Sequence, residues 1–111
     1  MFGQLARSGR AIVTSDYVVA EAINLAIARR GRPVAERLLD LFERSLGLRI
    51  EWIEANRFAT AKAYFRQHAD HGYSFTDCSS FVLMRELRIS DALTTDRHFV
   101  AAGFRSLLRG P

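Results

Sequence analysis

Residues 73–99 of the chain read YSFTDCSSFVLMRELRISDALTTDRHF, and they open with a helix-start pattern, SFTD at residues 74–77. Ser74 suits the N-cap of an α-helix, because its hydroxyl can accept a hydrogen bond from a free backbone N–H. Asp77 stands three residues later and completes an acidic variant of the capping box. We therefore predict a helix over about residues 75–87, with the Asp77 carboxylate in its first turn.

The same stretch carries a second carboxylate at the end of a predicted strand. Residues 92–95 (ALTT) predict a short buried strand, and Asp96 follows its last residue. In open parallel α/β sheets, ligands bind in the crevice outside the carboxyl ends of the strands. We expect Asp77 and Asp96 to face this crevice. A capping role would explain each acid without a ligand, Asp77 in its own helix and Asp96 at a helical turn over residues 97–102.

The rest of the chain alternates predicted strands with predicted helices. Strands are expected at residues 11–14, 48–53 and 103–107, helices at about 16–30, 33–45 and 56–71, and the tail of a helix at 1–9, ending at Gly9. Because strands separated by helical stretches pair in parallel, we predict an α/β fold of three layers, with a short parallel sheet flanked by helices. Since no repeat or linker interrupts the sequence, residues 1–111 are expected to form a single domain.

Composition limits the functional classes. The hydrophobic fraction of 49% is typical of a globular chain, no apolar run is long enough to span a membrane, and the N-terminus lacks a signal-peptide pattern. The lone cysteine, Cys78, excludes an internal disulfide and suits a reducing cytoplasm. The net charge is +4 and nearly all cations are arginines, which match phosphate oxygens bidentately and suit a nucleic-acid partner. The arginine bias of a GC-rich genome explains this charge equally well.

A third acid, Glu21, lies in the second turn of the helix predicted at residues 16–30. Val18 and Leu25 neighbour it on the helix surface, so Glu21 borders the apolar face. A favourable interaction with the helix dipole is the alternative explanation for this residue. Two carboxylates about 4 Å apart repel by roughly 4 kcal/mol at an effective dielectric constant near 20, so a cluster of three requires a cation or a raised pKa. We predict that Glu21, Asp77 and Asp96 meet around a divalent metal.

Three motifs, in this order and with helical spacers, resemble the PIN-domain ribonucleases. They are TSDYVVAE at residues 14–21, SFTD at residues 74–77 and TTDRHF at residues 94–99, closing on Gly103 and Phe104. The resemblance extends over about residues 9–107 and is closest to the VapC-like toxins of bacterial toxin–antitoxin pairs.

The resemblance implies a magnesium-dependent ribonuclease, with manganese as the alternative ion, in which Glu21, Asp77 and Asp96 are catalytic and hold the metal. It also implies RNA as the substrate, a cognate antitoxin that occludes the site, and a homodimer. The composition adds the expectation of a cytoplasmic protein without membrane contact. Oxygen ligands suit Mg²⁺, which can neutralise a phosphodiester in its transition state.

One departure from the family pattern changes the expectation for activity. PIN domains begin with a central strand that ends in Asp-Thr or Asp-Ser, and no segment before Thr14 matches it. We therefore expect the domain to be incomplete at its N-terminus, and to be both weakly active and poorly stable. A truncated, non-catalytic PIN-like module that binds RNA or an antitoxin is the alternative. A plain α/β scaffold with a basic surface would instead place the three acids apart.

Overall fold

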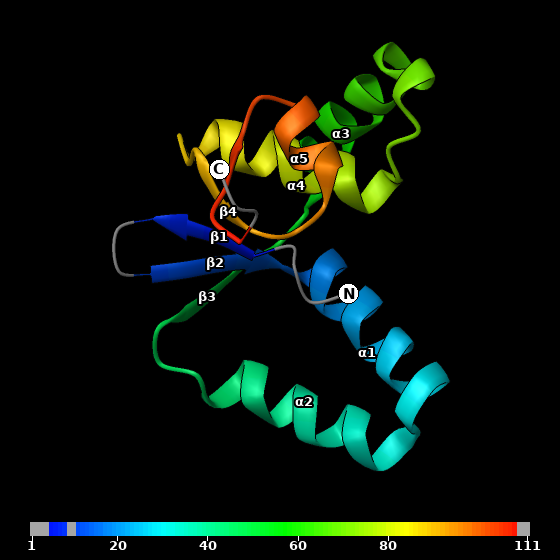
Figure 1. Ribbon diagram of the computed structural model, residues 1–111, viewed down its shortest axis with the longest axis vertical. Coiled ribbons are helices and arrows are strands. Elements are labelled where there is room, and N and C mark those ends of the chain that lie inside the picture. Colours follow the sequence, from blue (N-terminus) through cyan, green and yellow to red (C-terminus); the bar gives the residue numbers. More distant parts are fainter. Residues whose placement is uncertain (1–4, 9–10, 109–111) are drawn as a thin grey trace.

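A five-stranded sheet forms the middle layer of the computed structural model, which describes residues 5–8 and 11–108 (Figure 1). Its strands lie in the order β3-β2-β1-β4-β5, with bounds Leu5–Ser8 (β1), Ala11–Ser15 (β2), Leu48–Glu51 (β3), Asp91–Leu93 (β4) and Arg105–Ser106 (β5). β2 pairs with β3 in parallel and β4 with β5 in parallel, whereas β1 is antiparallel to both of its neighbours. The four other strands therefore share one direction, and their carboxyl ends lie at one edge of the sheet.

Strand β1 corrects two predictions. Residues 5–8 form a strand and not the tail of a helix, and the predicted stop at Gly9 lies outside the described residues. Ala6 is buried and pairs with Val13 on one side and Ala92 on the other. Hydrogen bonds to two neighbouring strands outweigh the helix preference of so short a segment. The sheet is consequently mixed, where a short parallel sheet was predicted.

The central place of the sheet is thus taken by β1, whose sequence LARS contains no acidic residue. The expectation that the domain is incomplete at its N-terminus stays a prediction.

Helices α1 (Asp16–Arg30) and α2 (Arg32–Arg44) cover one face of the sheet (Figure 1). α1 begins at the predicted place because the Ser15 hydroxyl accepts a hydrogen bond from Val18 N at 3.2 Å. It ends at Gly31, whose φ of 89° favours glycine and turns the chain into α2. Pro33 stands in the first turn of α2, where its missing N–H costs no helical hydrogen bond.

Helices α3 (Ala55–Gln67), α4 (Phe75–Glu86) and α5 (Arg97–Ala101) lie on the opposite side of the sheet, so the predicted three layers are present (Figure 1). α3 ends at Gln67, earlier than predicted, and a short 3₁₀ helix at Ala69–His71 follows it. Among the described residues, no helix combines the length and the apolar character that crossing a bilayer requires.

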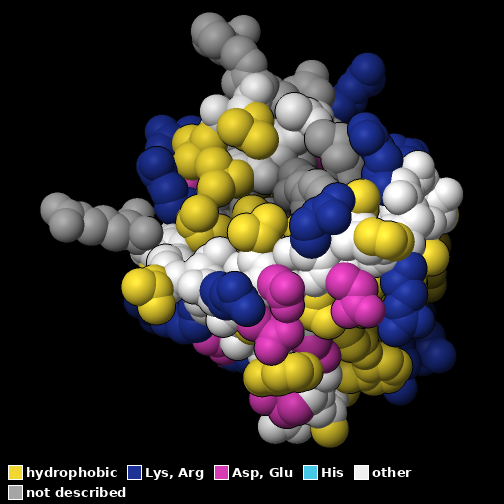
Figure 2. All heavy atoms as spheres, turned by 90° about the horizontal axis from the view of Figure 1, so that it is seen from below, with side chains coloured by type: hydrophobic (Ala, Val, Ile, Leu, Met, Phe, Trp, Pro, Cys, Tyr) yellow, Lys and Arg dark blue, Asp and Glu magenta, His cyan; other side chains and the backbone are white. Residues whose placement is uncertain are grey.

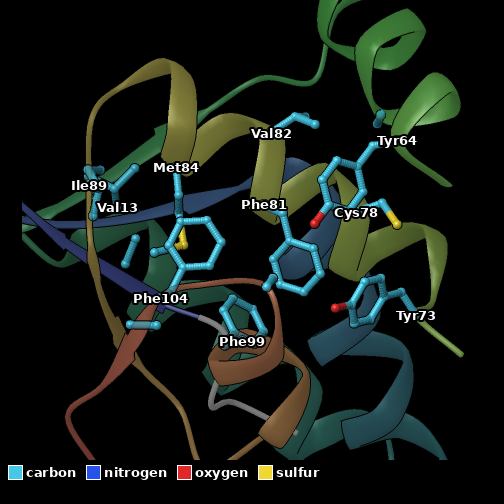
Figure 3. Close-up of a cluster of buried hydrophobic side chains, with 14 residues drawn as sticks. Val13, Tyr64, Tyr73, Cys78, Phe81, Val82, Met84, Ile89, Phe99 and Phe104 are labelled. Carbon is cyan, nitrogen blue, oxygen red and sulfur yellow. The ribbon is translucent and has the colours of Figure 1, made fainter. Parts of the chain in front are cut away.

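The hydrophobic core lies between α4 and the sheet, with α5 closing one end (Figure 3). Phe81 is fully buried at its centre, with ring centroids 4.9 Å from Phe99 and 5.0 Å from Tyr73. The other buried members are Ala6, Val13, Ala61, Tyr64, Cys78, Val82, Met84, Ile89, Ala92, Ala102 and Phe104. Since α4 carries Asp77 and α5 begins beside Asp96, this core fixes both carboxylates relative to each other.

Candidate active site

Asp77 occupies the first turn of α4, where the complete capping box is present. Asp77 N donates to the Ser74 hydroxyl at 2.9 Å, and Ser74 N donates back to Asp77 Oδ2 at 3.1 Å. The side chain is almost fully buried. These reciprocal bonds confirm the predicted cap and hold the carboxylate in one orientation, so capping does not exclude a second role for its oxygens.

Asp96 lies beyond the end of β4 and caps α5, as its sequence position allowed. Its Oδ1 accepts from His98 N at 2.9 Å, and its own backbone N–H donates to Thr94 Oγ1 at 3.0 Å. The Asp96 side chain is about one-third exposed. It is therefore fixed at the carboxyl edge of the sheet and open to a ligand.

His98 completes a cluster with these two acids. Its Nδ1 lies 3.1 Å from Asp77 Oδ2 and 3.5 Å from Asp96 Oδ1. A hydrogen bond to the Asp77 carboxylate requires the tautomer with the proton on Nδ1, because a carboxylate oxygen only accepts. One ligand atom from each of Asp77, Asp96 and His98 lies within 4.8 Å of the other two, and no other such group occurs in the described part of the chain. The predicted convergence of Asp77 and Asp96 is therefore present.

His98 belongs to the TTDRHF motif, and no role was predicted for it. The pattern that could have identified it is its place two residues after a helix-capping acid. A side chain in the first turn lies close to the capping carboxylate, and here His98 N donates to that carboxylate. The ring also packs edge-on against Tyr73, with centroids 5.3 Å apart, which fixes its direction.

Glu21 lies in the second turn of α1, on the solvent side, and is not a member of the group formed by Asp77, Asp96 and His98. The start of α1 is nevertheless close to the start of α4, because the ring centroids of Tyr17 and Phe75 are 6.3 Å apart. Glu21 follows Tyr17 by one helical turn. A role for Glu21 in the site stays a prediction.

The chemistry of the cluster follows from its donor atoms. Two carboxylates and one imidazole can bind a divalent metal, since carboxylate oxygen suits Mg²⁺ and Mn²⁺ and imidazole suits the transition ions. Cys78, next to Asp77, is an unsuitable nucleophile: burial above all, and then the Asp77 charge, raises the pKa of its thiol to about 11. The residues thus fit metal-assisted hydrolysis better than thiolate catalysis.

Comparisons with known proteins agree with this geometry. A profile described as PIN domain matches residues 3–105. The 23S rRNA-specific endonuclease VapC20 of Mycobacterium tuberculosis, in two strains, is 32% identical over 93 residues, which cover 84% of this chain and 70% of the relative.

The crystal structure of M. tuberculosis VapC20, described as a sarcin–ricin loop cleaving toxin, matches with a TM-score of 0.83 and 30% identity. The match covers 90% of this chain and 76% of that chain. The predicted α/β fold and the predicted resemblance to VapC-like ribonuclease toxins are confirmed. The chain belongs to the PIN domain family.

Proposed function

We propose that this protein is a metal-dependent endoribonuclease, the toxin of a toxin–antitoxin pair, that acts in the cytoplasm. The observation that carries the proposal is the convergence of Asp77, Asp96 and His98 at the carboxyl edge of the sheet. VapC20, a relative of this protein, is a 23S rRNA-specific endonuclease, which supports a structured ribosomal RNA loop as the substrate. The alternative, a non-catalytic module, predicts RNA binding without cleavage.

In this proposal Asp77, Asp96 and Glu21 hold Mg²⁺, or Mn²⁺ in its place, and His98 is a further ligand of the same ion. When bound, the ion would lower the pKa of a coordinated water and neutralise charge on the phosphodiester. Asp77 is fixed by its bond from Ser74 N, and Asp96 by its bond from His98 N, so both acids are oriented before a ligand arrives. Such preorganisation spares the free energy of ordering these side chains during the reaction.

The proposal is tested by incubating the purified chain with an RNA stem-loop that carries a label at one end. We expect discrete cleavage products in Mg²⁺ or Mn²⁺ and none after EDTA treatment. RNA that is bound in a gel-shift assay but never cut, at any concentration of either ion, would support the non-catalytic alternative. The assay is repeated on a chain extended by an Asp-terminated strand, which we expect to cleave faster and to melt at a higher temperature.

His98 gives a separate test of the metal site that does not depend on cleavage. Because imidazole suits Mn²⁺ better than Mg²⁺, we expect Mn²⁺ to raise the melting temperature at lower concentration than Mg²⁺ does. Replacing His98 with Asp makes the donor set all-oxygen and is expected to reduce this preference. The measurement is a thermal melt titrated with each ion. If the parent and His98→Asp show the same ratio between the Mn²⁺ and Mg²⁺ concentrations that raise the melting temperature, His98 is excluded as a ligand.

The groove between α1 and α2 is the surface that we propose for the antitoxin. It encloses about 400 Å³, with an apolar floor and three arginines at its rim; the lining residues are Ala22, Leu25, Ala26, Arg29, Arg30, Val34, Arg37, Leu38 and Leu41. Figure 2, which views the molecule from the side of α2, shows hydrophobic, acidic and arginine side chains together on this face.

An amphipathic antitoxin segment with acidic residues would match both the floor and the rim of this groove. Co-purification with the product of the neighbouring open reading frame is the measurement, and Leu41→Asp is expected to weaken it. We also propose a homodimer, and sedimentation of the protein without its antitoxin measures whether two copies associate.

A further inference from the structure

Four aromatic side chains form a continuous row at the edge of the central core, against which Phe75 packs. Phe58 and Phe65 are two helical turns apart on α3, and each remains 42% exposed. Their ring centroids lie 5.3 Å and 5.7 Å from that of Phe75, which in turn lies 6.3 Å from that of Tyr17. We call these four residues the aromatic strip. Exposed neighbouring rings in a monomer mark a surface that contacts a ligand or a partner.

The aromatic strip begins beside the proposed catalytic acid. Phe75 is the first residue of α4 and follows Ser74, whose backbone N–H donates to Asp77 Oδ2 at 3.1 Å. Tyr17 is in the first turn of α1, close to the carboxyl end of β2. The strip therefore extends from the edge of the sheet where Asp77 and Asp96 lie, outward along α3.

The helix that carries Phe58 and Phe65 is positively charged. α3 contains Arg57, Lys62 and Arg66 and no acidic residue. Arg57 is engaged by Glu86 at 2.6 Å and Glu51 at 3.0 Å, whereas Lys62 and Arg66 are exposed and form no ion pair with the residues that the structure describes. Lys62 follows Phe58 by four residues and precedes Phe65 by three, so it shares their face of the helix.

Exposed rings interspersed with unpaired cations are the pattern that binds single-stranded nucleic acid, in which bases stack on the rings and phosphates meet the cations. A second copy of this chain fits less well, because a twofold contact would bring two cationic α3 faces together. We propose that the aromatic strip stacks unpaired bases of the RNA next to the scissile phosphate. The inference rests on the proposed ribonuclease function, in which the scissile phosphate is held at Asp77 and Asp96.

The test measures binding by itself. Fluorescence anisotropy of a labelled oligoadenylate of about 12 nucleotides is recorded in EDTA, which prevents the proposed cleavage. The double variant Phe58→Ala/Phe65→Ala is expected to lose about tenfold or more in affinity, because each stacked base contributes appreciably. Phe58→Tyr/Phe65→Tyr keeps both rings and should bind like the parent. Leu46→Ala removes an exposed apolar side chain elsewhere and should also leave the affinity unchanged.

A second probe separates stacking from charge. An abasic oligonucleotide of the same length keeps every phosphate, so we expect the parent and the alanine double variant to bind it equally. If the alanine variant fails to fold in a thermal melt, Phe58→Leu/Phe65→Leu keeps the apolar bulk without flat rings and is expected to show the same loss.

Equal affinity of the parent and the ring-less variants for oligoadenylate would overturn the proposal. So would conversion of a dimer to a monomer by these variants with RNA affinity unchanged, which would assign the strip to a second copy. Loss of binding in the ring-less variants with no cleavage by the parent in Mg²⁺ or Mn²⁺ would leave the strip as an RNA-binding surface and remove the proposed nuclease function. The two proposals can therefore fail independently.

Discussion

Replacing Asp77 with Asn is expected to abolish RNA cleavage while leaving the metal-free fold as stable as the parent. Ser74 N and His98 Nδ1 both lie 3.1 Å from the same oxygen, Asp77 Oδ2. An asparagine carbonyl in that place keeps both hydrogen bonds, and Asn caps a helix about as well as Asp, so the change in unfolding free energy should stay within about 1 kcal/mol. The neutral amide loses the charge that would hold the ion, and cleavage should fall by at least the roughly 10–100-fold that follows the loss of a group supporting a metal ligand.

The measurement pairs thermal melts, with and without Mg²⁺, with the stem-loop cleavage assay. Asp77→Asn should show an unchanged or higher melting temperature without metal and no further rise when Mg²⁺ is added. Ser74→Ala is the matched control, because it removes a cap and spares the carboxylate; it should cost about 1 kcal/mol and retain cleavage. A marked loss of metal-free stability with cleavage retained would show that Asp77 serves only as a helix cap.

Replacing Phe81 with Ala is expected to cost about 3–5 kcal/mol, the largest stability effect that we predict. Phe81 is fully buried, and its ring contacts those of Tyr73, Phe99, Phe104 and Tyr64, with centroids 4.9–5.8 Å apart (Figure 3). Since whole domains are stable by only about 5–15 kcal/mol, this variant should be largely unfolded at elevated temperature.

Urea unfolding followed by circular dichroism measures this loss. Leu46→Ala, at a fully exposed position, should change the unfolding free energy by less than about 0.5 kcal/mol and serves as the control. A cost for Phe81→Ala close to that of Leu46→Ala would contradict the packing of α4 against the sheet.

The helices could be predicted from the sequence because their end signals are local. Ser15, Ser74 and Asp96 each accept the capping hydrogen bond that their residue type favours, and Gly31 has the positive φ expected at a helix end. The position of Asp77 and Asp96 at one edge of the sheet could be predicted for the same reason, since each lies at the end of a helix or strand.

Strand β1 and the contact of His98 with Asp77 were not predicted, because both depend in part on residues that are distant in the sequence. Four residues, LARS, have no periodicity of their own, and they become a strand only because β2 and β4 pair with them on both sides. The His98 side chain is positioned by the neighbouring Asp96 cap and by the Tyr73 ring. Tyr73 is distant from His98 in the sequence and reaches it only when the core forms. Tertiary contacts, and not propensity, decide both features.

The position of β1 has a consequence for the order of folding. Its two ladders differ greatly in contact order, because Ser8 pairs with nearby Ala11, whereas the Arg7–Asp91 contact joins residues 84 positions apart. Closing the long loop costs more chain entropy, so the β1–β2 ladder should form first and the β1–β4 ladder late. Pulse-labelled hydrogen exchange during refolding should therefore show amides of the β1–β2 ladder protected before those of β4. The edge of the sheet at which Asp77 and Asp96 meet would therefore be assembled only in the last step of folding, because β4 positions Asp96.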